Sequence, residues 1–482
     1  MAFSYAYFFQ GGGWNQNAHF DTIRALVERG TLEITAYASN TGDVSRIGAR
    51  VFSNKPPGLA LVAAPFYLVV TKAEQALGLE RDNPRVITAN AHLVTFLASG
   101  LPAALVVLAL FFEFRAQGAS VHNATLLAAA SGWGTLLLPY AGVAMSHNLV
   151  TLCLFAAIAA VQRYPAERGR LILAGTLLGV ASLVDYLVGP LTLVVFVFLF
   201  LRSAGGHLRF LWLLPGPVLA GLTLLLLNRF TFGEFWVTSY SHQADTFTQP
   251  GLLLGVLDWP QPARLYWLTV HPFRGILTIC PALLVSLLVL LRPRRAAQAA
   301  RKNPLALVAI AFFALFNLSF NGWTGGWGVG PRYLIPAIPF VLVFLWEGWR
   351  CAQRLGSVLL VISAVFMLGA SAVNVMVPAP NSGPPLPTSA VLMNLRELAN
   401  GHVSTSTQGV LDYGPAPPQE ASAHFWDSYN LGELIGLRNL ASLVPLLGVI
   451  GGFLTIVRPR FRGPAQAQAT QRKGAWGDRQ RP

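Results

Sequence analysis

Charged residues are scarce in this sequence. Only 11% of its 482 residues are Asp, Glu, Lys or Arg, whereas 54% are hydrophobic. A soluble chain carries about 25% charged residues. Apolar runs of about 20 residues, long enough to cross a bilayer, recur along most of the chain. The composition therefore excludes a string of soluble domains and predicts an all-α polytopic membrane protein.

The sequence has fewer acidic residues than basic residues, 20 against 34, and its net charge is +14. In a soluble protein this excess would suggest nucleic acid. In a membrane protein basic residues are expected in cytoplasmic loops. The basic clusters here, at 292–302 and in the tail 458–482, stand at the ends of apolar segments. The expected partners are therefore membrane lipids and not nucleic acid, and no oligomeric state is predicted.

Cofactor and metal motifs are also lacking. The three cysteines lie within or just after apolar segments, so they predict no disulfide framework. No histidine pair has the spacing of zinc ligands, and there is no nucleotide-binding glycine motif, serine nucleophile elbow or Cys–His arrangement. We therefore name no metal ligand, and a divalent cation (Mg²⁺ or Mn²⁺) is the one cofactor left open.

Apolar segments define a topology of about eleven transmembrane helices. With the basic tail in the cytoplasm, the connections that carry Arg or Lys alternate onto the cytoplasmic side. The outer loops are then 11–85, 229–274, 321–332 and 378–437. The segments are 86–113, 122–141, 143–162, 170–186, 187–201, 208–228, 275–291, 304–320, 333–349, 355–377 and 438–457.

The same topology divides the chain into regions. Residues 1–10 have half the length of a span, and we expect them to be the remnant of a first transmembrane helix whose true start lies upstream. The apolar run 58–77 cannot cross the membrane, because both of its flanks lie on the outer side. We expect an interfacial helix there. The bundle follows at 86–377, then a Pro-rich outer loop at 378–437 and a last helix at 438–457.

The stretch "VFSNKPPG" (51–58) opens that interfacial helix. Ser53 or Asn54 can cap a helix, and prolines are tolerated in its first turn. A helix amino end with Lys55 beside it suits an anion, phosphate above all. The alternative is that Lys55 reaches out to the membrane interface. Both readings stay open at this point.

A second cation follows a Gly-rich outer loop. In "NGWTGGWGVGPRYLIPAIPF" (321–340), two tryptophans suit the membrane interface, and Arg332 stands at the outer mouth of a helix. An arginine on the outer side runs against the usual charge bias and suits a phosphate or carboxylate ligand. We therefore take Arg332 as a candidate binding residue.

Few acids are both outward-facing and close to membrane depth. Asp21 and Asp43 lie in the first outer loop, and Asp185 ends a helix at the outer side. An ionisable group at such a depth is a functional candidate. His147 stands at the outer start of another helix, where a packing role is the alternative.

Together these elements resemble the GT-C superfamily of membrane glycosyltransferases. The likeness rests on a first outer loop followed by "SNKPPG", many helices, "GPRYLIPAIPF" and the carboxy-terminal "NLGELIGLRNLASLVPLL" (430–447). It is similar above all to bacterial relatives of the dolichyl-phosphate-mannose protein mannosyltransferases and to the aminoarabinose transferases. The resemblance implies a GT-C-like bundle and inverting sugar transfer from a polyprenyl-phosphate donor to an extracytoplasmic lipid, glycan or protein. The expected location is the bacterial cytoplasmic membrane, with the site facing outside.

The resemblance also implies roles for single residues. Lys55 matches the family lysine that contacts the lipid phosphate, and Arg332 could supply a second cation. The family's early Asp-Glu pair is replaced by the amides Asn15, Gln16 and Asn17, whose carbonyls can orient hydroxyl groups. A further family acid is replaced by His147. The base is therefore sought first in Asp43, then in Asp21 or His147. A non-catalytic binder and a transporter or flippase of lipid-linked sugars are the alternatives.

Overall fold

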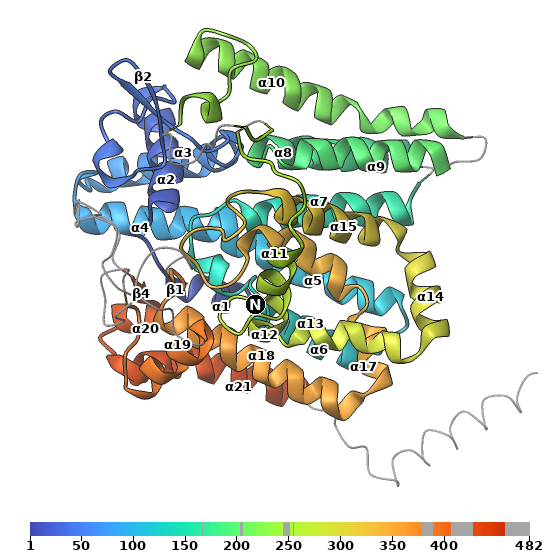
Figure 1. Ribbon diagram of the computed structural model, residues 1–482. Coiled ribbons are helices and arrows are strands. Elements are labelled where there is room, and N and C mark those ends of the chain that lie inside the picture. The colour runs from blue at the N-terminus through green and yellow to red at the C-terminus, as the bar shows by residue number, and fades with distance from the viewer. Residues whose placement is uncertain are drawn as a thin grey trace, which may run out of the picture.

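The computed structural model describes residues 1–165, 167–202, 206–243, 251–253, 255–377, 389–405 and 428–457. The basic tail 458–482 and most of the Pro-rich loop 378–437 lie outside these residues. Within them, long helices lie side by side and form one bundle (Figure 1). Its helices are α4 (Pro84–Thr95), α5 (Leu101–Ala116), α6 (Val121–Trp133), α7 (His147–Arg163), α8 (Arg168–Val184), α9 (Val188–Arg202), α10 (Pro215–Phe232), α13 (Ala282–Leu287), α15 (Pro304–Ser319), α16 (Ile338–Leu342), α17 (Leu345–Cys351), α18 (Gln353–Val373) and α21 (Val444–Val457).

Among the described residues, four helical stretches are long and apolar enough to cross a membrane: Pro84–Ala116, His207–Phe232, Gln353–Val373 and Asn439–Val457. Two bent helix pairs raise the number to six, with bends of 91° at 302–304 and 65° at 342–345. The shorter apolar helices include α7 and α9. The described chain is thus an all-α polytopic membrane protein, and the count of about eleven spans stays a prediction.

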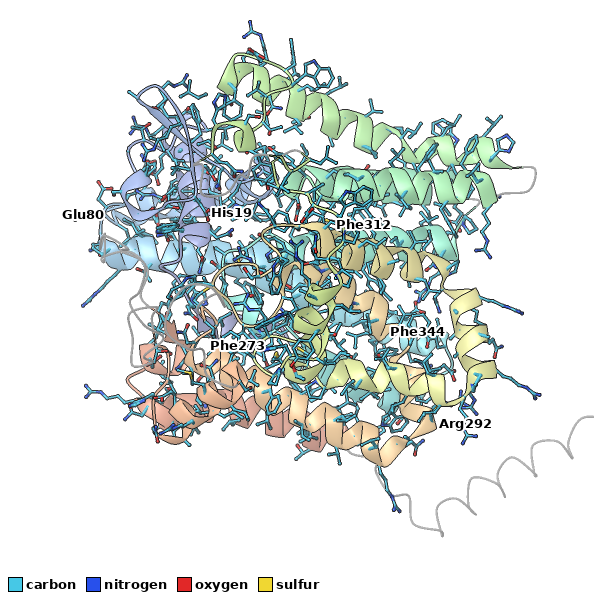
Figure 2. All side chains as sticks on the ribbon, in the orientation of Figure 1. His19, Glu80, Phe273, Arg292, Phe312 and Phe344 are labelled. Carbon is cyan, nitrogen blue, oxygen red and sulfur yellow. The ribbon has the colours of Figure 1, made fainter. Side chains whose placement is uncertain are left out.

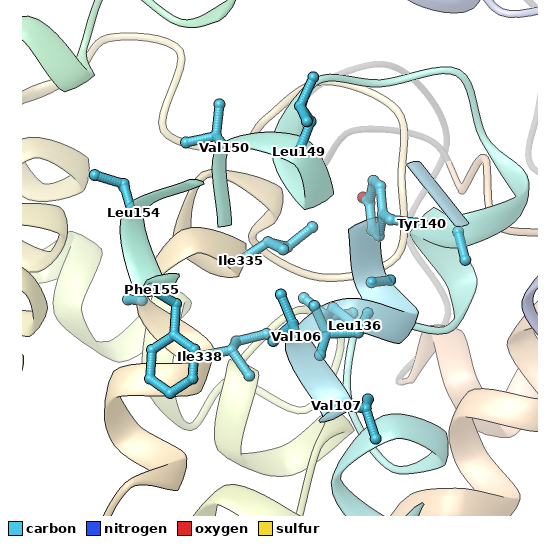
Figure 3. Packing of buried hydrophobic residues seen from close by; sticks show 14 of the residues in the cluster. Val106, Val107, Leu136, Tyr140, Leu149, Val150, Leu154, Phe155, Ile335 and Ile338 are labelled. Atoms are coloured by element: carbon cyan, nitrogen blue, oxygen red, sulfur yellow. The ribbon is translucent and has the colours of Figure 1, made fainter. Parts of the chain in front are cut away.

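The core of the bundle forms where α5 and α7 meet the turn η8 (Arg332–Ala337) and α16. Figure 3 shows Val106 of α5, Leu154 and Phe155 of α7 and Ile335 of η8 among the packed side chains. Val106, Leu154 and Ile335 have no exposed surface. This packing fixes the outer end of η8, where Arg332 stands, against the outer end of α7, where His147 stands.

Small residues bring α8 and α10 into backbone contact. Gly175 and Gly179 of α8 lie one turn apart and face Leu213 and Gly216 at the start of α10. A Cβ placed on Gly179 would lie 2.5 Å from the carbonyl oxygen of Gly216. Close helix approach through glycines four residues apart is a common way of joining helices in membranes. It attaches α10, which otherwise has many exposed apolar side chains, to the bundle.

We expect Gly179→Val to separate α8 from α10 and to destabilise the protein. Overpacking of this kind costs about 1–3 kcal/mol, so the melting temperature in detergent should fall by several degrees. Gly221→Val on α10 is the matched control, because a Cβ at Gly221 meets nothing within 4 Å. Equal melting temperatures for the two variants would contradict the glycine contact.

The amino-terminal segment is built into the bundle. α1 (Ala2–Ala6) is a helix of five residues, and the Tyr5 hydroxyl donates to the Gly132 carbonyl at 2.9 Å. The short strand β1 (Phe8–Phe9) pairs antiparallel with β4 (Tyr429–Asn430). The region expected to be the remnant of a transmembrane helix therefore contains a short helix, in which Ser4 and Tyr5 are buried, followed by a strand.

The first outer loop folds as a separate layer at one end of the bundle. It contains α2 (Trp14–Arg29), the hairpin of β2 (Val44–Ile47) and β3 (Arg50–Ser53), and α3 (Gly58–Leu77). Figure 1 shows this layer at the left, opposite the basic helix α14 (Pro293–Lys302) at the right. In Figure 2, His19 and Glu80 mark the first end and Arg292 the other. α3 occupies the range of the expected interfacial helix and is not among the helices apolar enough to span.

Candidate functional site

The β2–β3 hairpin positions an ion pair. Its strands are joined by the two residues Gly48 and Ala49, and Gly48 has a φ of +58°, which a tight hairpin turn of this kind requires. Asp43 therefore precedes one strand just where Lys55 follows the other. The Lys55 Nζ lies 3.0 Å from the Asp43 Oδ1, and the Asn54 amide donates to the same oxygen at 3.4 Å.

The expected capping by Ser53 or Asn54 is wrong. α3 begins at Gly58, its N-cap is Pro57, and no side chain caps it. Ser53 still belongs to β3, and its hydroxyl accepts a hydrogen bond from the Lys55 N–H. The strand pairing competes successfully for these residues, so the helix can start only beyond the two prolines.

Lys55 does not reach out to the membrane interface. Its side chain is 17% exposed and is paired with Asp43. The start of α3 is held against the end of α8, because a Cβ on Gly58 would lie 2.3 Å from the backbone of Leu183 and Val184. The position of Lys55 is therefore fixed by packing on both sides, from the hairpin and from α3.

Arg332 enters the site from the Gly-rich loop. Gly325, Gly326, Gly328 and Gly330 all have positive φ, and Gly325 lies directly against the Arg332 side chain. The guanidinium contacts the Met145 sulfur at 3.6 Å. In the part of the chain that the structure describes, Arg332 forms no ion pair with a carboxylate, and its Nε has no hydrogen-bond partner. Arg332 is thus a cation that can still donate a hydrogen bond to a ligand.

His147 links the two cations. Its ring packs edge-on against the rings of Tyr140, at 6.1 Å, and Tyr333, at 5.6 Å. The charges of Arg332 and Lys55 both act on it. Lys55, Asp43, Arg332 and His147 therefore come together at one site, although they come from three distant parts of the sequence.

His19 completes this group, and the sequence interpretation missed it. It lies on α2, is 4% exposed, and feels the charges of Lys55, Asp43 and Arg332. Burial, with a further contribution from Lys55, lowers the pKa of His19 to about 3, so the ring is neutral at physiological pH. Among the described residues it has no side-chain hydrogen bond. The only sequence signal is its spacing of one helical turn from Asn15.

The amides before His19 divide between two faces of α2. Asn15, His19 and Thr22 are spaced i, i+4 and i+7 and share one face, and Thr22 lines the same cleft as Lys55. Asn15 is half-buried. The two amide atoms of Gln16 are buried and have no hydrogen-bond partner among the described residues.

Asn17 and Asp21 lie on another face. The Asn17 amide donates to the Asn40 carbonyl at 2.8 Å, and the Asn40 amide donates to the Asp21 Oδ1 at 3.5 Å. Burial raises the pKa of Asp21 well above its ordinary range. The contacts of Asn17 and Asp21 are thus within α2 and its neighbouring turn, and the structure does not bring them to Lys55 or Arg332.

Asp185 lies at the edge of the site. It follows α8 and accepts a hydrogen bond from the Leu187 N–H at 3.0 Å. Its charge and that of Asp43 both act on Tyr240, which is 41% exposed. Tyr240 belongs to a turn of the loop 229–274, and this turn is joined to the hairpin by a hydrogen bond from the Ser239 hydroxyl to the Asn54 carbonyl at 3.2 Å.

An open cleft leads to Lys55 from the side of α10. Its volume is about 370 Å³ including its open mouth. Its polar lining residues are Thr22, Ser53, Lys55, Tyr186, Asn228, Thr231 and Ser239. The apolar lining comes from the first loop and from α10: Leu32, Phe52, Pro57, Leu227 and Phe232.

Behind the site, Glu28 anchors α2. Its carboxylate accepts hydrogen bonds from the Tyr67 hydroxyl at 2.6 Å, the Tyr37 hydroxyl at 2.9 Å and the Arg24 Nε at 3.1 Å. Burial would raise the pKa of Glu28, but these hydrogen bonds outweigh it and lower the pKa below its ordinary value of 4.5.

We expect Glu28→Gln to cost about 1–2 kcal/mol of stability at pH 7, because charge-assisted hydrogen bonds are lost. A carboxylate with a lowered pKa in the folded state stabilises fully above pH 4.5, and this contribution disappears as the pH falls through the lowered value. Thermal unfolding at pH 7 and pH 3.5 measures the difference between wild type and variant. A difference that does not shrink at the lower pH would contradict the role of the carboxylate.

The described residues contain no group of three His, Cys, Asp or Glu side chains placed to hold a metal ion. Lys55 and Arg332 are cations, and of the groups around them only Asp43 is a carboxylate in direct contact with one of them. The arrangement suits an anionic ligand.

Comparisons with known proteins give two structural similarities. No model of a known protein family matches the chain, and no curated protein matches it. ArnT from Cupriavidus metallidurans, in the apo state, is 16% identical, with a TM-score of 0.43 over 77% of this chain and 61% of that chain. The Archaeoglobus fulgidus oligosaccharyltransferase, in the apo form, is 12% identical, with a TM-score of 0.43 over 77% of this chain and 53% of that chain.

This chain spans 61% of the length of the first and 53% of the length of the second.

Proposed function

We propose that the protein transfers a sugar from a polyprenyl-phosphate donor to an extracytoplasmic acceptor, which is a lipid, a glycan or a protein, with inversion at the sugar. One observation carries the proposal: Lys55 lines a cleft that also has apolar side chains, and Arg332 contributes with Lys55 to the charge around His19 and His147. A donor of this kind has a phosphate for the cations and an isoprenoid chain for the apolar side chains.

The chemistry requires cations where these two lie. As the bond from the sugar to the phosphate breaks, negative charge grows on the leaving phosphate oxygen. Preorganised positive groups stabilise that charge more than they stabilise the bound donor, which lowers the barrier. The amino end of α3, three residues beyond Lys55, adds a partial positive charge of the same sign.

The acceptor side of the proposal uses the polar groups that face the cations. Asn15 can orient a sugar or acceptor hydroxyl, and Asp43 and His147 are the candidate bases that lie beside the cations. Asp185 and Tyr240 are direct sequence neighbours of Tyr186 and Ser239, which line the cleft, and we place the entry of the acceptor there. The proposed location is the bacterial cytoplasmic membrane with this layer outside, and the proposal assigns no residue to a divalent cation (Mg²⁺ or Mn²⁺).

Reconstitution tests the proposal. The protein is placed in liposomes with a doubly labelled polyprenyl-phosphate sugar, and the release of free polyprenyl phosphate and the transfer of the sugar are measured. Turnover with an inverted product supports the proposal. Binding without turnover across donors and acceptors points to a lipid-phosphate binder, and passage of intact donor across the bilayer points to a flippase.

A further inference from the structure

We propose that His19 takes the proton of the acceptor hydroxyl, and that the donor's phosphate prepares it for this by neutralising Lys55 and Arg332. The inference rests on the proposed transfer reaction. It concerns a residue that lies outside the sequence motifs and to which the family resemblance assigns no role. His19 lies on the face of α2 that also carries Asn15 and Thr22, and Thr22 and Lys55 both line the cleft.

The placement of His19 is unlike that of the other candidates. Asp43 is bound to Lys55 at 3.0 Å and accepts from Asn54, so its charge is already used to hold the lysine in place. His147 is packed between the rings of Tyr140 and Tyr333. His19 alone of the three forms no hydrogen bond, ion pair or ring contact in the described part of the chain, although it is buried beside both cations.

The charges around His19 come from several elements. Lys55 and Arg332 oppose its protonation, and Asp43 favours it. His19 in turn acts on His147, on α7. Of the ionisable groups on α3 and β3, which pack against α2, Tyr67 bonds to Glu28 and Arg50 bonds to Glu33, while Lys72 is exposed and Glu74 is buried.

This environment keeps the imidazole neutral until a donor binds. A phosphodiester pairs with Lys55 and Arg332 and cancels much of their effect on His19. The phosphate gains a further negative charge as it leaves, and this favours an imidazolium nearby. The proton affinity of His19 therefore rises when the proton has to be taken, which suits a general base.

The step balances as follows. The acceptor oxygen attacks C1 of the sugar as the bond from C1 to the phosphate oxygen breaks. The electron pair of that bond stays on the phosphate, which departs as polyprenyl phosphate with one more negative charge. The acceptor proton passes to a ring nitrogen of His19 and then to water.

Kinetics give the first test. We expect His19→Gln to lower kcat by about 10²–10⁴-fold, with the KM for the donor changed little, and to remove the acidic limb of the kcat–pH profile. His122→Gln, a half-buried histidine on α6 outside the site, is the control and should match wild type. Equal melting temperatures of the two variants show that His19→Gln folds.

The Asp43→Asn variant distinguishes between His19 and Asp43 as the general base. If His19 is the base, Asp43→Asn keeps the acidic limb. A His19→Gln variant within threefold of the wild-type kcat, or a limb that disappears in Asp43→Asn instead, would overturn the inference while the transfer reaction stands. If the wild-type protein shows no turnover with any donor, the proposed function is overturned, and the proposed proton transfer is overturned with it.

Titration gives a second test that does not depend on turnover. The nine histidines are labelled with ¹³C at Cε1, and His19 is assigned from the signal missing in His19→Gln. Farnesyl phosphate should raise the titration midpoint of His19 by at least about one pH unit, whereas farnesol, which lacks the phosphate, should not. Equal midpoints with the two ligands would overturn the coupling to the phosphate.

Discussion

Lys55→Met should lower the kcat of sugar transfer by about 10²–10³-fold, the loss typical of removing one preorganised group that stabilises developing negative charge. Methionine keeps the length of the side chain and removes its charge. The measurement is the release of polyprenyl phosphate from a labelled donor by the reconstituted protein. Lys55→Arg keeps the charge and should recover part of the rate, since arginine also binds phosphate.

Two controls accompany this prediction. Lys72→Met removes an exposed lysine from α3, the helix that follows Lys55, and should leave kcat unchanged. Lys55→Met also leaves Asp43 without its partner, so the variant should lose stability, and Lys55→Met with Asp43→Asn should regain it without regaining activity. Full turnover in Lys55→Met would remove the lysine from the phosphate site.

Arg332→Met should also lower kcat by about 10²–10³-fold. Its guanidinium has no carboxylate partner among the described residues, so its removal leaves no acid unpaired and should change stability little. Arg332→Lys keeps one charge but loses the planar pair of donors, and we expect an intermediate rate. Steady-state kinetics over a range of donor concentrations distinguish a loss in kcat from a loss in donor affinity.

Arg46→Met is the matched control for Arg332. It removes an exposed arginine from β2 in the same outer layer, and it changes the net charge equally. If Arg332→Met and Arg46→Met lowered kcat by the same factor, general electrostatic attraction of the anionic donor would explain the effect. A large effect of Arg332→Met alone supports direct contact with the phosphate.

In the first outer loop, the sequence predicted helix α3 correctly but not the residue at which this helix begins. The apolar run and its bounding glycines predicted the helix that the structure places at Gly58–Leu77. The start of that helix was mispredicted, because capping preferences describe an isolated helix. Here Ser53 ends a strand whose partner begins at Val44, and the Asn54 N–H donates to the Asp43 carbonyl at 3.1 Å, so contacts between the two arms of the hairpin decide their conformation.

The site shows the same division. Lys55 and Arg332 could be chosen from the sequence because each is a basic residue in a segment expected on the outer side, where basic residues are unusual. His19 could not, because nothing in its own neighbourhood is unusual. Its position becomes informative only when α2 places it beside charges from residues 43, 55 and 332. Asp21, two residues further on, turns towards Asn40 because two residues rotate the side chain by more than half a helical turn.

The pairing of β1 with β4 sets an order on biogenesis. The Tyr7 hydroxyl donates to the carbonyl of Ser442, 435 residues away, and Phe8 pairs with Asn430. These contacts cannot form on the ribosome until the chain has been synthesised and inserted past residue 442. Tyr7 and Phe8 must therefore wait for partners that are made late, and contacts of such separation form slowly. A nascent chain stalled before residue 429 should accordingly leave β1 without its partner strand and should be cut by protease near Tyr7 faster than the full chain.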